Sequence, residues 1–84
     1  MSEIEILAKI ESVISEILGR KVGPLTREMT ADTIEGWDSL SHIQIVVGLE
    51  RLFGIRFSAA ELIDYQNIGA LADGIQRKLP EKVD

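Results

Sequence analysis

The sequence contains no cysteine, so its own side chains can form neither a disulfide nor a thiolate metal site. Aromatic residues make up only 5% of its 84 residues, so any core must be built mainly from aliphatic side chains. No apolar run approaches the roughly 20 residues that a membrane-spanning helix needs. No charged segment followed by an apolar one marks a secretory signal. We therefore expect a cytoplasmic protein without a membrane span.

A basic surface is also missing. Nine Lys and Arg residues stand against fourteen Asp and Glu residues, which gives a net charge of −5, and no stretch gathers the basic residues into a stripe. Nucleic-acid binding depends on such a stripe, so we expect no nucleic-acid partner. An acidic surface suits a basic protein partner, although mild negative charge most often serves solubility alone.

Catalytic groups are equally scarce. His42 is the only histidine, and no nucleophile or second metal ligand is spaced to join it. Its place between apolar helical positions predicts an exposed face. The sequence has no phosphate-binding glycine loop, zinc pattern or calcium loop, and its carboxylates fall on predicted solvent faces. We therefore expect a protein that is not an enzyme and holds no metal.

Helical periodicity dominates what is present. Apolar residues recur at i, i+3, i+4 and i+7 in several segments, as in helices with one buried stripe. The length suits a single domain over residues 1–84. We predict an all-α four-helix bundle with three long helices and one short helix. The expected helices lie at about residues 3–18, 39–53, 58–64 and 67–79, with a frayed tail at 80–84.

A long connection separates the first two expected helices. Gly23-Pro24 prevents a helix from continuing there, and loops of this length are usually functional or disordered. Leu25 and Trp37 are among its apolar anchors. We expect this loop to lie across the bundle, with one helical turn near residues 26–29.

The junction between this loop and the second helix carries Asp38-Ser39. Both residue types are common N-caps, and a cap is the simplest interpretation. A helix N-terminus also presents unpaired N–H groups and a partial positive charge, which favour an anion. A serine at this point is suited to carry a phosphoryl group. These residues alone leave both interpretations open.

The second helix has a wider apolar surface than one buried stripe requires. Either it lies centrally in the bundle or part of that surface faces a partner. Gly48 lies inside this helix, where glycine costs about 1 kcal/mol relative to alanine. Close approach of another helix or of a ligand would explain it.

At this point the sequence resembles the acyl carrier proteins over about residues 4–79. The resemblance is carried by Gly36-Trp37-Asp38-Ser39-Leu40 and by the positions that follow, which are Ile43, Val46, Val47, Leu49, Glu50, Phe53-Gly54-Ile55 and Phe57. It implies that a phosphopantetheinyl transferase attaches a 4′-phosphopantetheine arm from coenzyme A to Ser39. It also implies that Asp38 caps the helix and helps the transferase to recognise the site. The thiol of the arm would carry an acyl group as a thioester, which fits the missing cysteine.

The resemblance further assigns two surfaces. A partner-docking face would consist of Leu40, Ile43, Gln44, Val47, Glu50 and Phe57. Five apolar side chains are candidates to line a space between the helices where a bound chain shelters, namely Leu49, Phe53, Leu62, Ile68 and Leu71. Ordinary core packing explains the same five positions more simply.

This chain departs from housekeeping carriers of fatty acid synthesis, whose second helix tends to be strongly acidic. The matching positions here include His42, Gln44 and Arg51, and Trp37 replaces a small residue. We infer a freestanding, monomeric, specialised carrier for fatty acid, polyketide or related lipid biosynthesis. Its partners would be the transferase, an acyl-loading ligase or synthase, and acyltransferases. The alternatives are an aminoacyl or peptidyl carrier loaded by an adenylating ligase, and an unmodified helical protein-interaction module.

Overall fold

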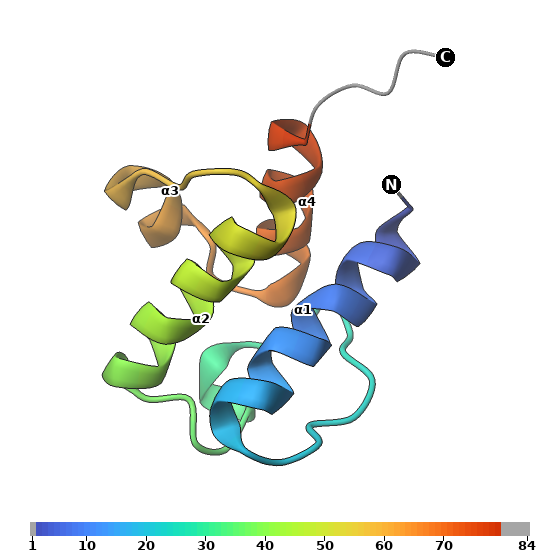
Figure 1. Ribbon diagram of the computed structural model, residues 1–84, viewed down its shortest axis with the longest axis vertical. Helices are drawn as coiled ribbons and strands as arrows, with labels where there is room; N and C mark the ends of the chain where they lie inside the picture. The colour runs from blue at the N-terminus through green and yellow to red at the C-terminus, as the bar shows by residue number, and fades with distance from the viewer. Residues whose placement is uncertain (1, 80–84) are drawn as a thin grey trace.

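The computed structural model describes residues 2–79 as an arrangement of four α-helices (Figure 1). The predicted all-α bundle of three long helices and one short helix is confirmed. The frayed tail expected at 80–84 lies outside the described residues. The helices are α1 (Glu3–Leu18), α2 (Ser39–Phe53), α3 (Ala59–Asp64) and α4 (Ile68–Lys78).

The helix ends differ from the prediction by no more than one residue. Ser58 and Asn67 lie just outside α3 and α4 because each is an N-cap, whose side chain accepts a hydrogen bond from a backbone N–H three residues later. The end of α4 falls at Lys78, since Leu79 already has extended backbone angles. Gly19 and Gly54 end α1 and α2 in the left-handed conformation that glycine adopts readily.

The core forms where α1 packs against both α2 and α4. Its best-buried side chains are aliphatic, as the shortage of aromatic residues requires, and they are Ile6, Ile10, Ile14, Ile45, Leu49, Ile68 and Ile75. A Cβ on Gly48 would lie 2.9 Å from Val13 Cγ1. The glycine therefore lets α1 and α2 approach closely, which is one of the two explanations that the sequence suggested for it.

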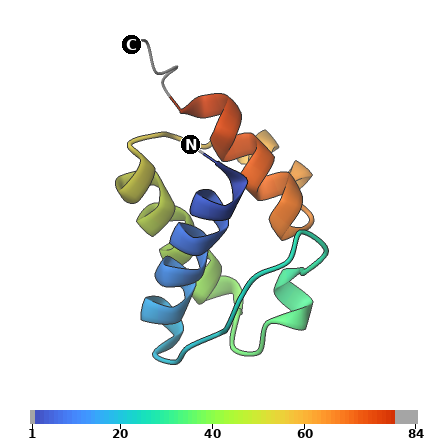
Figure 2. The ribbon, with the colours of Figure 1, turned by 90° about the vertical axis from the view of Figure 1, so that its right-hand side faces the viewer.

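The loop between α1 and α2 lies across the bundle, as expected (Figure 2). A hydrogen bond from Met29 N–H to the Thr26 carbonyl closes a turn at the predicted position, while the helical turn itself comes later, as the 3₁₀ helix η1 (Ala31–Thr33). The loop also caps α4, because Ile68 N–H donates to the Met29 carbonyl at 2.8 Å. Its path is therefore set by the start of α4 as well as by its own apolar residues.

Arg27 fastens this loop to two helices. Its guanidinium forms ion pairs with Asp73 on α4, at 2.7 Å, and with Glu3 on α1. The Arg27 carbonyl accepts a hydrogen bond from Gly69 N–H at 2.9 Å. A Cβ on Gly69 would lie 2.9 Å from Arg27 Cβ, so this glycine makes room for the arginine.

The short helix α3 is tied to α4 by an ion pair that makes stability depend on pH. Glu61 Oε2 lies 2.7 Å from Lys78 Nζ, and Glu61 also completes a capping box with Ser58. The hydrogen bond from Lys78 and those from Ser58 lower the pKa of Glu61 to about 2 from its ordinary value of 4.5. The unfolded chain therefore takes up this proton first as the pH falls, and the stabilisation is lost between about pH 4.5 and pH 2.

We expect a Glu61→Gln variant to melt at a lower temperature than the wild type near neutral pH. The difference should shrink as the pH falls toward 2, because the wild-type carboxylate is then protonated. Thermal melts followed by circular dichroism over this pH range measure both effects. A difference that stays constant from neutral pH to pH 2 would contradict the assigned role of Glu61.

Candidate functional site

At the start of α2 one residue caps the helix and the next residue has a free hydroxyl. Asp38 is the N-cap, with its Oδ1 accepting a hydrogen bond from Ser41 N–H at 2.9 Å. Ser39 is the first helical residue and is exposed. No hydrogen bond engages its side chain within residues 2–79. The structure thus assigns the cap to Asp38 and leaves the Ser39 hydroxyl available.

The electrostatics of this turn suit an anion. Hydrogen bonds from Ser41 to Asp38 lower the pKa of the Asp38 carboxyl, so the cap is ionised at neutral pH. His42 N–H donates to the Asp38 carbonyl at 2.8 Å. Among the described residues, the backbone N–H groups of Ser39 and Leu40 have no backbone carbonyl partner, while that of Leu40 also helps to lower the pKa of the Asp38 carboxyl. A phosphate on Ser39 Oγ would therefore lie beside backbone N–H groups at the positive end of α2.

Four of the six predicted docking residues form an exposed strip on α2. Leu40, Ile43 and Val47 have exposed fractions of 67%, 61% and 40%, which is high for large apolar side chains, and Gln44 is exposed beside them. Exposed apolar area on this scale is typical of a surface that meets a partner.

The other two predicted docking residues also have a structural role. Phe57 N–H donates to Glu50 Oε2 at 2.8 Å, and the Phe57 ring packs edge-on against Tyr65 with centroids 5.8 Å apart. Both Glu50 and Phe57 are therefore half-buried where the chain passes from α2 to α3. Their part in docking stays a prediction, and the structure adds that their contact forms only when the link folds back on α2.

Three exposed large apolar side chains were not among the predicted docking residues, and one of them, Ile4 at 80% exposed, lies on α1. Leu52 on α2 has an exposed fraction of 47%, and Ile63 on α3 one of 76%. The six-residue helix α3 contains no buried residue. Its apolar positions therefore could not be sorted into core and surface from periodicity.

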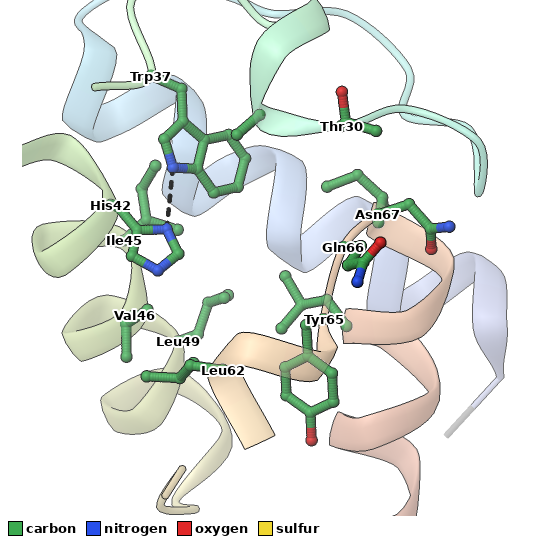
Figure 3. A pocket seen from close by; sticks show the side chains of 13 residues that line it. Thr30, Trp37, His42, Ile45, Val46, Leu49, Leu62, Tyr65, Gln66 and Asn67 are labelled. Atoms are coloured by element: carbon green, nitrogen blue, oxygen red, sulfur yellow. Dashed lines mark hydrogen bonds between the residues drawn. The ribbon is translucent and has the colours of Figure 1, made fainter. Parts of the chain in front are cut away.

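A cavity of about 70 Å³ lies between α2, α3, α4 and the loop (Figure 3). Four of the five candidate residues line this cavity, namely Leu49, Leu62, Ile68 and Leu71. Phe53, the fifth, is buried in the core but does not line the cavity. The lining also includes residues that the sequence did not indicate, which are Thr30, Ala31, Trp37, His42, Ile45, Val46, Tyr65, Gln66 and Asn67.

Tyr65 shows why part of this lining was missed. A Cβ on Gly74 would lie 2.2 Å from Tyr65 Oη, so the tyrosine packs directly on the glycine of α4. Burial is also the main cause that raises the pKa of the Tyr65 hydroxyl. A glycine inside a helix was the available signal for close approach, but the sequence does not name the side chain that uses the space.

His42 does not lie on an exposed face, contrary to the prediction. It is half-buried and lines the cavity, with its ring centroid 6.0 Å from that of Trp37. Trp37 Nε1 donates a hydrogen bond to His42 Nδ1 at 3.2 Å (Figure 3). The helical pattern alone could not reveal this, because the covering side chain comes from the end of the loop.

Two kinds of site find no support in residues 2–79. No group of three or more His, Cys, Asp or Glu side chains there is placed to hold a metal ion. Within the same residues, every helix is too short or too polar to cross a membrane.

Comparison with known proteins identifies the family. A family model described as the phosphopantetheine attachment site matches residues 8–75. An acyl carrier protein of Thermotoga maritima is 33% identical over 78 residues, which cover 93% of this chain and 96% of that protein. The chain belongs to the acyl carrier protein family.

Other family members agree with this assignment. An acyl carrier protein of Guillardia theta is 33% identical over 81 residues, covering 94% of this chain and 98% of that protein. The solution structure of a holo acyl carrier protein from Geobacter metallireducens matches with a TM-score of 0.80 and 36% identity. That match covers 87% of this chain and 84% of the other.

Family membership makes this protein a carrier of covalent phosphopantetheine rather than a catalyst. When bound, this group supplies a thiol that can hold an acyl group as a thioester. The first turn of α2 fits the attachment, because it offers an exposed hydroxyl on Ser39 at the positive end of the helix.

Proposed function

We propose that this acyl carrier protein holds acyl intermediates as thioesters on a 4′-phosphopantetheine arm attached to Ser39. It then presents them to partner enzymes of fatty acid, polyketide or related specialised lipid biosynthesis. The observation that carries the proposal is the exposed Ser39 hydroxyl at the N-terminus of α2, freed from capping by Asp38. The family match includes this residue, since it spans residues 8–75.

The residues of the first turns of α2 have different roles in this proposal. Asp38 holds the first turn in shape, and the same side chain would help the transferase to recognise the site. Ser39 presents the hydroxyl that is modified, and the amides around it favour the phosphate charge. Leu40, Ile43 and Val47 offer an apolar surface close by for partner enzymes.

Tethering is the means by which such a carrier accelerates a pathway. A cargo held on a flexible arm reaches each docked enzyme at a high effective concentration. We propose that a phosphopantetheinyl transferase, an acyl-loading ligase or synthase, and acyltransferases dock in turn on a monomeric carrier in the cytoplasm.

The charge of α2 supports a specialised rather than a housekeeping role. Its exposed strip carries Gln44 among apolar residues, and Arg51 follows at its C-terminal end. Such a surface steers basic partners less strongly than a strongly acidic helix would. Dedicated partner enzymes that rely more on apolar contact would suit it better.

Intact-mass measurement tests the proposal. Coexpression with a broad-specificity phosphopantetheinyl transferase should add one phosphopantetheine unit to the chain. No mass gain, under conditions that fully modify a control acyl carrier protein, would contradict it. The protein purified from its native host should then carry an acyl group, whereas an amino acid on the arm would assign it to the aminoacyl carriers.

A further inference from the structure

Two residues close to the proposed attachment point, one before it and one after it in the sequence, line the cavity. Trp37 precedes Ser39 by two residues, and His42 follows it by three, one turn further along α2. Both side chains line the cavity, and they are joined by a hydrogen bond (Figure 3). Two residues within one turn of the proposed attachment point thus line the cavity.

The hydrogen bond between Trp37 and His42 determines which nitrogen of the imidazole carries the hydrogen. The indole N–H can only donate, so His42 Nδ1 must be the unprotonated nitrogen that accepts it. The neutral ring then carries its hydrogen on Nε2, on the side turned away from Trp37 (Figure 3). Among the described residues nothing accepts a hydrogen bond from Nε2. Nε2 of this cavity-lining residue is thus left as a free donor.

The cavity itself is small. An apolar cavity of about 150 Å³ holds a benzene molecule, so 70 Å³ corresponds to a chain of about three or four carbons. The side of the cavity that α2 forms is held in place by packing. Ile45 and Leu49 are fully buried, and Gly48 is in close contact with Val13 of α1. A longer chain would have to displace Trp37 or a buried wall residue.

We propose that Trp37 and His42 determine cargo specificity by restricting the cavity to acyl groups of about four carbons or fewer. Trp37 limits the length with its ring and fixes the imidazole. His42 donates from Nε2 to the carbonyl oxygen of the thioester while the alkyl part enters the cavity. The inference rests on the proposed function, because it requires cargo on an arm at Ser39.

A series of acyl lengths tests the inference on the whole carrier. A broad-specificity transferase loads it from coenzyme A thioesters with acyl chains of about two, four, six and eight carbons, which bracket the cavity's capacity. Intact mass confirms each product. From the two-carbon to the four-carbon chain, we expect the melting temperature to rise by about 3 °C for each buried carbon. The two longer chains should give no further rise.

Spectroscopy reads out the two residues directly. Trp37 is the only tryptophan, so its fluorescence should change with the four-carbon cargo. The ¹⁵N resonances of His42 should show a protonated Nε2 in the unloaded holo form, and this resonance should move with the same cargo. A hydrogen on Nδ1 would overturn the assignment of the donor.

Variants of Trp37 separate the effect of the size of its ring from the effect of its hydrogen bond to His42. Trp37→Ala should extend the rise in melting temperature to the six-carbon chain, whereas Trp37→Phe should keep the length limit and lose the fixed His42 tautomer. Ser41→Ala is the matched control, because Ser41 is two residues from Ser39, as Trp37 is, but lies outside the cavity. It should keep the wild-type profile, and circular dichroism checks that each variant is folded.

The outcomes distinguish this inference from the function on which it rests. A chain that cannot be loaded at all overturns both. A loaded carrier that the eight-carbon chain stabilises more than the four-carbon chain overturns the length limit alone. So does a Trp37→Ala variant that folds and keeps the wild-type length profile.

Discussion

A Ser39→Ala variant coexpressed with a broad-specificity phosphopantetheinyl transferase should gain no mass, while the wild type gains one phosphopantetheine unit. The reason is that Ser39 combines an exposed hydroxyl with the first position of α2. Alanine should leave the helix intact, because the Asp38 side chain supplies the cap through its hydrogen bond to Ser41 N–H. The loss of modification would therefore reflect the missing hydroxyl and not unfolding.

Ser41→Ala provides a matched control on the same turn. Ser41 lies two residues further along and is half-buried, and its backbone N–H, which alanine keeps, donates to the capping Asp38 side chain. This variant should be modified as completely as the wild type. Equal modification of Ser39→Ala, or loss of modification in Ser41→Ala alone, would place the attachment elsewhere. Circular dichroism should show similar helix content in all three proteins.

A Leu49→Ala variant should lose about 2–5 kcal/mol of unfolding free energy. Leu49 is 0% exposed and lies on the α2 wall shared by the core and the cavity. Removing its side chain subtracts buried apolar surface and enlarges a space that is already partly empty. For a domain of this size the change is a large share of the total stability, and the melting temperature should fall by 10 °C or more, roughly.

Leu52→Ala is the comparison, because it removes the same atoms from the same helix. Leu52 is 47% exposed, so the variant should lose about 1 kcal/mol or less. Urea unfolding followed by circular dichroism measures both variants. Equal losses at the two positions would contradict the assignment of Leu49 to the core, whatever their size.

The helices and their starts were accessible from the sequence because their causes are local. Ser58 and Asn67 each accept a hydrogen bond from a backbone N–H three residues away, so both partners lie within one turn of chain. The same holds for Asp38 and Ser41. The cap and the serine beside it could be located for this reason, whereas the attachment to Ser39 was indicated by the resemblance to the acyl carrier proteins.

The features that the sequence did not predict depend on contacts between elements. Glu50 holds the backbone of Phe57 only because the link after α2 folds back. His42 is covered because the loop returns Trp37 over the first turn of α2. Phe53 has the same helical spacing as cavity residues on its helix, yet it packs in the core beyond the cavity. Periodicity specifies a buried stripe but not which neighbour fills each part of it.

The sequence by itself thus determined the four helices, their caps and the serine at the start of α2, since hydrogen bonds and apolar spacing within a few residues suffice for these. Only the tertiary structure decided that a small cavity exists and that Trp37 and His42 bound it. The physical reason is that a cavity is what remains after side chains from several elements have packed. Its size and its lining follow from where α2, α3, α4 and the loop meet.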